Sequence, residues 1–282
     1  MSSTNLDKAD YEEPVCLICD PRTGERKNTS SIPMQRIVDK LEEYCTLKDF
    51  AGAERHLGYW LSEAQAQGDL RGQFSLRNEM MGFYRKQGEY DKAVASVNEA
   101  VRLMQVLDNE DSISGATCHV NCGTVYDTFS EPENALLHFT KAEEIFAGLA
   151  FKDLFRLGSL YNNMALAYME LGQYPEAFVY YAKALNTMEQ LSGSELEQAI
   201  TYLNMADCSA LEKGLDGASG EISAYLEKAK NLIDTEGLNR DGYYAFVCEK
   251  CSPGFNCYGD FDYAEELDRR AADIYNKAKG SE

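Results

Sequence analysis

Three alanines at equal spacing are the feature of this 282-residue sequence that most limits its fold. Ala93, Ala135 and Ala177 follow one another at intervals of 42 residues. Each has a tyrosine nine residues before it and another alanine seven residues after it, namely Tyr84 and Ala100, Tyr126 and Ala142, and Tyr168 and Ala184. Self-similarity at a fixed period is the signature of repeat architectures, in which each unit buries its apolar face against the next. The sequence therefore predicts an array of equivalent units.

Each unit has the pattern of a helical hairpin. Residues 161–184 read YNNMALAYMELGQYPEAFVYYAKA, in which apolar and small side chains recur at the spacing of one helix face: Tyr161, Met164, Ala165 and Tyr168. Gly172 ends this helix, and a second helix follows with Ala177, Tyr181 and Ala184 on its inward face. Other parts of the sequence can be aligned on this hairpin.

These positions resemble the tetratricopeptide repeat, whose pattern combines a bulky residue, Leu-Gly or Leu-Ala, Tyr, a turn glycine and Ala. The hairpin at 161–184 matches it with Tyr in place of the leading Trp. The hairpin around Ala93 keeps Tyr84, Gly88 and Tyr90, whereas the one around Ala135 has SEPEN in place of the turn. Further along the chain, the turn lengthens to EKGLDGASG and then CSPGFNCYGD is inserted. The long period is similar to that of kinesin light chains and bacterial peptide-sensing regulators.

The resemblance implies an all-α fold, a right-handed α-solenoid of about six hairpins. We expect this solenoid to span residues 34–279, with hairpins at 34–66, 72–107, 114–148, 156–191, 196–234 and 238–279. Residues 1–33 are polar and rich in turn-forming residues, so we expect an N-terminal tail that carries a CxxC pair. One hypothesis is that this tail folds into the groove of its own chain.

The charge balance limits the partners of the chain. It has 47 acidic and 27 basic residues, a net charge of −20, which repels nucleic acid and anionic membranes and suits a neutral or basic peptide or protein segment. The N-terminus is acidic and polar, and no apolar run approaches the roughly 20 residues of a membrane span. The nine cysteines fit a reducing compartment. We therefore expect a cytoplasmic protein.

Asparagines recur two positions before the small residue of the first helix, at Asn121, Asn163 and Asn204. The resemblance implies that this position lines a concave groove and that its amides hydrogen-bond the backbone of a bound peptide, because an amide is both donor and acceptor. A carboxylate clamp, as in proteins of this family that bind chaperone tails, would need Lys or Arg beside the asparagines. The positions in question hold Ser75, Thr117 and Ser159, so the sequence disfavours a clamp of this kind. The alternative is that such an asparagine is simply solvated, or bonds a neighbouring helix as part of repeat packing. The full set of expected groove residues is Asn78, Glu79, Arg85, Asn121, Thr124, Asp127, Asn162, Asn163, Asn204 and Asp207.

Two cysteine pairs have the spacing of zinc ligands. They are Cys16 with Cys19 and Cys248 with Cys251, and Cys257 follows the second pair. The hypothesis of a metal site competes with one in which Cys248 is a buried helix residue and Cys251 ends that helix. Cys118, His119 and Cys122 are best explained as core residues. The sequence lacks GxSxG, HExxH and Walker-type motifs, so we expect neither enzymatic activity nor a cofactor.

These patterns favour a non-catalytic scaffold or adaptor that binds a peptide or protein segment along its concave face. The first alternative is a signalling regulator whose groove senses a peptide effector. The second, less favoured alternative is a zinc- or thiol-dependent protein that uses its CxxC pairs.

Overall fold

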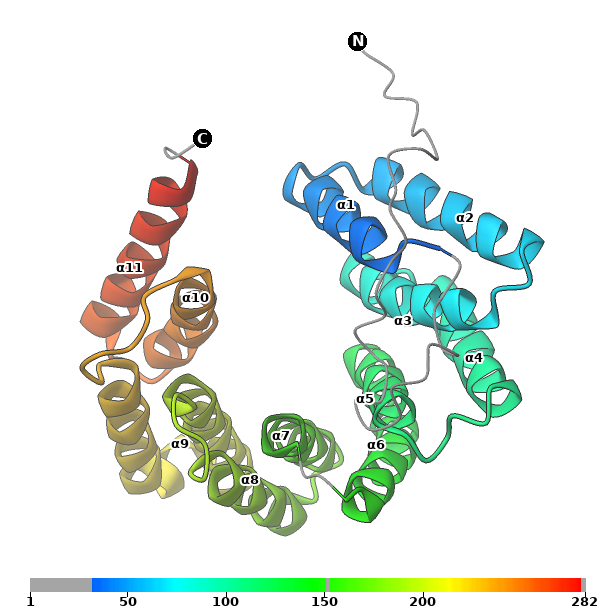
Figure 1. Cartoon of the computed structure of the whole chain (residues 1–282). Helices are drawn as coiled ribbons and strands as arrows, with labels where there is room; N and C mark the ends of the chain where they lie inside the picture. Colours follow the sequence, from blue (N-terminus) through cyan, green and yellow to red (C-terminus); the bar gives the residue numbers. More distant parts are fainter. Residues whose placement is uncertain (1–31, 151–152, 280–282) are drawn as a thin grey trace. The chain divides into compact units, whose positions relative to one another are not determined.

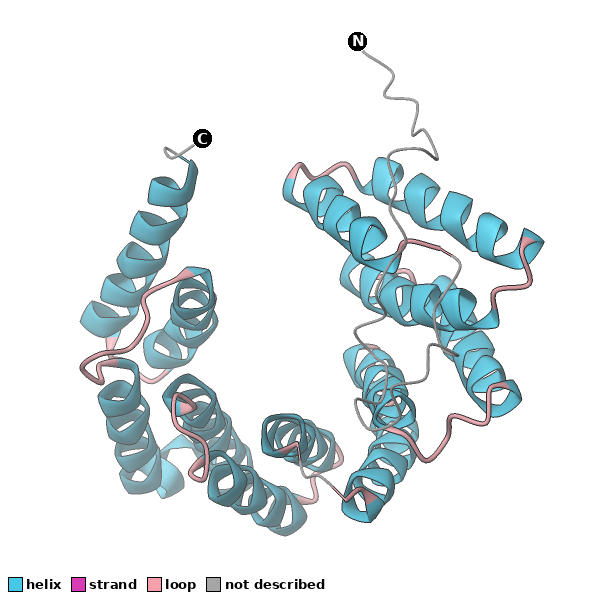
Figure 2. Cartoon of the chain, viewed as in Figure 1, coloured by secondary structure: helices cyan, strands magenta, loops and turns pink. Residues whose placement is uncertain are grey.

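The computed structural model describes residues 32–150 and 153–279. Within these ranges the chain forms eleven α-helices and no strand (Figure 2). Consecutive helices pack against each other in pairs. The predicted all-α fold of helical hairpins is confirmed.

The chain divides into two compact units, residues 1–149 and 150–282. The first unit holds α1 (Met34–Thr46), α2 (Phe50–Ala66), α3 (Leu70–Gln87), α4 (Tyr90–Val106), α5 (Ile113–Thr128) and α6 (Pro132–Gly148). The second holds α7 (Leu154–Glu170), α8 (Tyr174–Met188), α9 (Glu195–Ile233), α10 (Gly242–Cys257) and α11 (Phe261–Lys279) (Figure 1).

The turn inside each regular hairpin is built in the same way. One residue adopts a left-handed conformation, with φ of 56° at Lys48, 72° at Gly88, 57° at Ser130 and 70° at Gly172. The next amide then donates to the carbonyl of the tyrosine near the end of the first helix, as Glu131 N does to Tyr126 O at 2.9 Å. This bond satisfies a carbonyl at the helix end that has no partner inside the helix. The stretch SEPEN therefore keeps the turn, with Ser130 in place of glycine.

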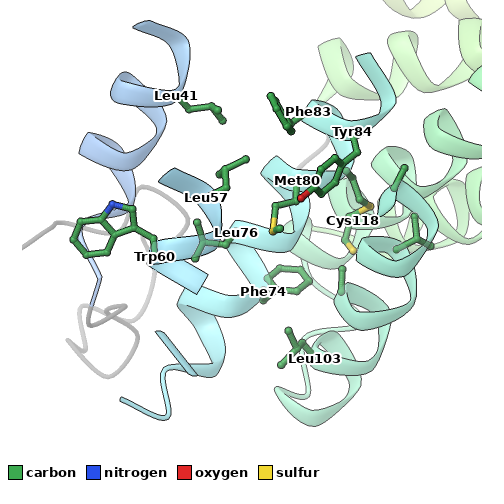
Figure 3. Packing of buried hydrophobic residues seen from close by; sticks show 14 of the residues in the cluster. Leu41, Leu57, Trp60, Phe74, Leu76, Met80, Phe83, Tyr84, Leu103 and Cys118 are labelled. Carbon is green, nitrogen blue, oxygen red and sulfur yellow. The ribbon is translucent and has the colours of Figure 1, made fainter. Parts of the chain in front are cut away.

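The alanines that define the period pack at the centre of the hairpins. Ala53, Ala93, Ala135 and Ala177 are all fully buried, because two helix backbones approach closely only where the side chain between them is small. In the first unit, one continuous apolar cluster extends from Leu41 to Cys118 and Cys122 (Figure 3). It includes Trp60 of α2 and Leu103 of α4.

The two irregular segments of the second unit are more helical than their sequences indicate. The stretch EKGLDGASG, expected to be a long turn, is helical within α9 except at Gly214, whose φ of 74° and ψ of 162° separate two helical segments. Most of the expected insertion CSPGFNCYGD continues α10, with Pro253 inside the helix. The buried ring of Phe255 packs edge-on against that of Tyr263, with 4.8 Å between the ring centroids. Ser252 Oγ donates a hydrogen bond to Ala264 O at 3.1 Å. These tertiary contacts outweigh the weak helix propensity of Gly and Pro.

None of the helices in the described ranges combines the length and the hydropathy that a membrane crossing requires.

Candidate functional site

In the first unit, the expected groove asparagines bond to each other. Asn121 Nδ2 of α5 donates to Asn78 Oδ1 of α3 at 3.1 Å, and Asn78 Nδ2 donates to Phe74 O of its own helix at 2.9 Å. Both side chains are half-buried. The bond joins residues 43 positions apart and links two successive hairpins. The alternative in which an asparagine bonds a neighbouring helix therefore applies to Asn121.

The charged residue Arg85 is also partnered inside the first unit. Arg85 Nη1 donates to Thr128 Oγ1 at 3.4 Å. Burial lowers the pKa of the Arg85 guanidinium, and the nearby Asp127 carboxylate opposes that shift. Thr124 Oγ1 donates to Val120 O of its own helix at 2.9 Å. These expected groove residues thus use their hydrogen-bonding capacity largely within the protein.

Glu79 occupies the position that an asparagine takes in the next hairpin. Its carboxyl is half-buried, and burial raises its pKa. Repulsion from Glu42 of α1 adds to the rise, whereas Lys86 opposes it. Glu42 is a neighbour that counting along the repeat does not identify, because it lies on a different helix.

The second unit repeats the asparagine pair. Asn204 Nδ2 of α9 donates to Asn162 Oδ1 of α7 at 3.2 Å, across 42 positions. In both units, therefore, the asparagine two positions before the small residue bonds to the asparagine one position earlier in the preceding hairpin. Asn163 differs from its equivalents, because its half-buried side chain forms no hydrogen bond with a described residue. Both the donor and the acceptor of its amide remain available.

Asp207, the last expected groove residue, is bound to the following hairpin. Tyr258 OH, just after α10, donates to Asp207 Oδ1 at 2.6 Å. Burial raises the pKa of Asp207, and the hydrogen bond from Tyr258 opposes that rise. The sequence analysis missed Tyr258, because it lies in the stretch expected to be an insertion, whereas the structure places it at the end of α10, directly before a left-handed turn at Gly259 like that at Gly172.

The cysteines lie mainly in apolar surroundings. Cys248 and Cys251 are buried in one apolar cluster with Tyr244 and Phe255, and burial raises the pKa of the Cys251 thiol to about 12. Such a thiol stays protonated at neutral pH and is a poor metal ligand or nucleophile. Cys257 is exposed, while Cys118 and Cys122 are buried in the first unit. In residues 32–150 and 153–279, no group of three or more His, Cys, Asp or Glu side chains could hold a metal ion. Cys16 and Cys19 lie outside the described residues.

A family model and two solved structures match the chain. The model of the tetratricopeptide repeat matches residues 74–147 and 156–217. The crystal structure of BtubC (BKLC) from P. vanneervenii has a TM-score of 0.54 and 21% identity, over 85% of this chain and 92% of that one. The crystal structure of a single-substitution variant of a Podosopora anserina putative kinesin light chain, with nearly identical TPR-like repeats, has a TM-score of 0.50 and 15% identity, over 72% of this chain and 94% of that one. No curated protein matches the sequence.

At these identities the solved structures establish similarity of fold. The repeats named for the putative kinesin light chain agree with the family model. The matched ranges begin in α3 and end in α9, so they cover the regular hairpins on which the period was found. Residues 74–147 and 156–217 of the chain therefore form tetratricopeptide repeats.

Proposed function

We propose that the chain is a non-catalytic scaffold that binds a peptide or protein segment along the first helices of its hairpins, with the Asn163 amide as a contact to the main chain of that segment. Tetratricopeptide repeats stack into surfaces that bind protein or peptide partners. An amide that offers both a donor and an acceptor can pair with one peptide unit regardless of its side chain.

The unpaired amide of Asn163 is the observation that supports this proposal most directly. Asn121 and Asn204 already bond to Asn78 and Asn162. Asn163 has the same register and is half-buried, yet it bonds to no described residue. A half-buried amide without a partner loses hydrogen bonds with water that a ligand can replace.

The charges at the other expected groove positions are partly neutralised within the protein. Arg85 lies beside Thr128 and Asp127, and Asp207 accepts the Tyr258 hydroxyl. A site of this kind favours recognition of an uncharged main chain over a terminal carboxylate. The net charge of −20 further favours a neutral or basic segment.

The test begins with a peptide selected from a random library on the full chain. Its affinity is then measured for the wild type, for Asn163→Ala and for Asn98→Ala, which removes an exposed asparagine from α4. We expect Asn163→Ala to weaken binding by about five- to tenfold, because a net hydrogen bond contributes about 1 kcal/mol. Asn98→Ala should leave binding unchanged.

A second measurement separates main-chain recognition from contact with a side chain. N-methylation of successive peptide bonds of the selected peptide should weaken wild-type binding strongly at one bond, and this loss should be absent in Asn163→Ala. If Asn163→Ala binds all peptides like the wild type, Asn163 does not contact the main chain and the proposal fails.

A further inference from the structure

We propose that the second unit carries a pocket for a guanidinium side chain, formed by the start of α9, the loop before α10 and the exposed ring of Tyr243, beside which the exposed ring of Phe246 lies. The inference rests on the proposed function in one respect: the guanidinium is assigned to an arginine of the bound segment. It adds a side-chain preference to the main-chain contact proposed for Asn163.

Two large aromatic rings lie exposed beside each other on α10. Tyr243 is 44% exposed and Phe246 is 49% exposed, with ring centroids 6.1 Å apart and planes inclined by 25°. Exposed aromatic side chains that form a flat surface are favourable contacts for guanidinium groups, which stack on ring faces. A single exposed ring is common on protein surfaces, but a stacked pair is a larger apolar area.

Carboxylates without cationic partners surround this surface. Tyr243 OH donates to Glu197 Oε1 at 2.8 Å, which places the Glu197 carboxylate beside the ring pair. The Oε2 atoms of Glu195 and Glu197 are buried, and neither has a hydrogen-bond partner among the described residues. A buried carboxylate oxygen without a donor is costly, and a bound cation would remove that cost.

A pocket lies at the Tyr243 ring, which contacts both Phe246 and Glu197. It is lined by Glu195, Glu236, Asp241 and Tyr243, together with neighbouring residues of the loop. Within residues 153–279, none of its carboxylates forms an ion pair, and Arg240 of the same loop lies over the Tyr244 ring at 5.5 Å. The pocket therefore combines the Tyr243 ring with carboxylates that form no ion pair with a described residue of this unit.

Guanidinium fits this combination better than ammonium. It can stack on a ring while its edge donates two parallel hydrogen bonds to a carboxylate, whereas an ammonium is a compact and strongly hydrated charge. The occupant is thus an arginine of the bound segment.

The test uses small probes, so that it does not depend on the asparagine contacts. Nα-acetyl-arginine amide, its neutral analogue Nα-acetyl-citrulline amide and Nα-acetyl-lysine amide are titrated into the full chain, with ¹³C-labelled Tyr and Phe rings observed by NMR. We expect the arginine probe to shift the Tyr243 and Phe246 signals with saturation. The citrulline probe should bind at least about fivefold more weakly, since it carries no charge and a partly desolvated cation–π contact or ion pair contributes about 1 kcal/mol. The lysine probe should also bind more weakly, because an ammonium is strongly hydrated and cannot donate two parallel hydrogen bonds to a carboxylate while it stacks on a ring.

Matched variants complete the test. The double variant Glu195→Gln/Glu197→Gln should weaken the arginine probe at least about fivefold, whereas Glu227→Gln, which neutralises a carboxylate elsewhere on α9, should not. Tyr59 of the first unit, 50% exposed beside Trp60, serves as the control ring. Equal shifts with arginine and citrulline, equal shifts of Tyr59, or no saturable shift would overturn the pocket, and equal binding of lysine would overturn its assignment to arginine. None of these outcomes depends on Asn163, so the peptide experiment and this one can fail separately.

Discussion

The third hairpin, in the first unit, and the fourth, in the second, place three aromatic rings at equivalent positions with different chemistry. In the third hairpin, the ring of Tyr126 stacks on that of His138 with 5.6 Å between the ring centroids, and His119 Nδ1 lies 2.9 Å from His138 Nδ1. In the fourth hairpin, the ring of Tyr168 stacks on that of Tyr180 with 5.3 Å between the ring centroids, and the centroid of Tyr161 lies 6.0 Å from that of Tyr180. Each pair of equivalents is 42 residues apart. The repeat fixes where the rings lie, and the residue type decides how they respond to charge.

A lysine next to each ring group shows the same contrast. Lys183 Nζ lies over the ring of Tyr180 at 4.2 Å and over that of Tyr161 at 5.2 Å, which is a favourable cation–π arrangement. The equivalent residue Lys141 forms an ion pair with Glu144 at 3.1 Å. Its positive charge also lowers the pKa of His119, because it disfavours protonation of that imidazole. The same position thus stabilises the fourth hairpin and makes the third sensitive to protonation.

The largest change in the free energy of unfolding is expected when the small residues of the first helices, Gly123 in the third hairpin and Ala165 in the fourth, are exchanged. A Cβ on Gly123 would lie 2.4 Å from Cε1 of buried Phe139, whereas the equivalent pair in the fourth hairpin is Ala165 with buried Tyr181. Gly123→Ala should therefore lower the free energy of unfolding by about 3 kcal/mol, the upper range for overpacking. Ala165→Gly should lower it by about 1 kcal/mol through helix propensity.

Urea denaturation followed by Trp60 fluorescence measures the change in the first unit, and hydrogen exchange of α7 measures it in the second. If Gly123→Ala is neutral, the two hairpins pack their cores in the same way and the structural contrast is wrong.

The next effect is acid destabilisation of the third hairpin. Burial and the neighbouring His119 lower the pKa of His138 to about 4, and burial followed by Lys141 lowers that of His119, with Glu110 opposing. A folded-state pKa below the ordinary value of about 6.5 means that this stability is present above pH 6.5 and is lost as the pH falls towards 4. We expect a loss of about 2 kcal/mol over this interval, after allowance for the partial exposure of the rings.

The double variant His119→Tyr/His138→Tyr supplies the control, because it installs the residue types of the fourth hairpin. Its urea midpoint, followed by Trp60 fluorescence between pH 7 and 4, should fall less than that of the wild type. His56, whose pKa burial also lowers, remains in both proteins. Parallel curves for the two proteins would show that the histidine pair does not cause the acid response.

The asparagine pairs provide a smaller comparison between the units. Asn121→Ala removes the donor to Asn78 Oδ1, and Asn204→Ala removes the donor to Asn162 Oδ1. Each should lower the free energy of unfolding by about 1 kcal/mol, whereas Asn163→Ala should change it little because its amide has no partner to lose. Thermal unfolding of the three variants measures this, and a loss in Asn163→Ala as large as in the others would contradict the pairing.

The sequence predicts the helical hairpins well because their requirements are local and visible. Close helix contact requires a small residue such as Ala177, and the left-handed turn is best made by glycine, as at Gly172. It predicts the fifth and sixth hairpins less well. Gly and Pro in these segments favour turns by propensity, whereas buried Phe255 and the Ser252 hydrogen bond keep α10 helical.

The repeat register predicts which residues belong to the candidate site, but it does not predict their hydrogen-bond partners. Counting along the period identifies Asn121, Asn163 and Asn204 as equivalent, yet only the structure shows that the first and last are paired with the preceding hairpin. Tyr258 approaches Asp207 across 51 positions, from a stretch whose sequence indicates an insertion and not a hairpin turn. Partners of this kind depend on the packing of hairpins, which a one-dimensional pattern does not contain.

The smallest effect concerns the turn that all regular hairpins share. Ser130 adopts a φ of 57°, a conformation that its equivalents reach with Gly88 and Gly172. A non-glycine residue is strained there by about 1 kcal/mol, and glycine gives back part of that gain through the greater entropy of the unfolded chain. Ser130→Gly should therefore raise the free energy of unfolding by about 0.5 kcal/mol, while Gly172→Ser should lower it by a similar amount. Urea midpoints of both variants check this, and a destabilised Ser130→Gly would mean that the Ser130 side chain supplies a stabilising contact that outweighs the backbone strain.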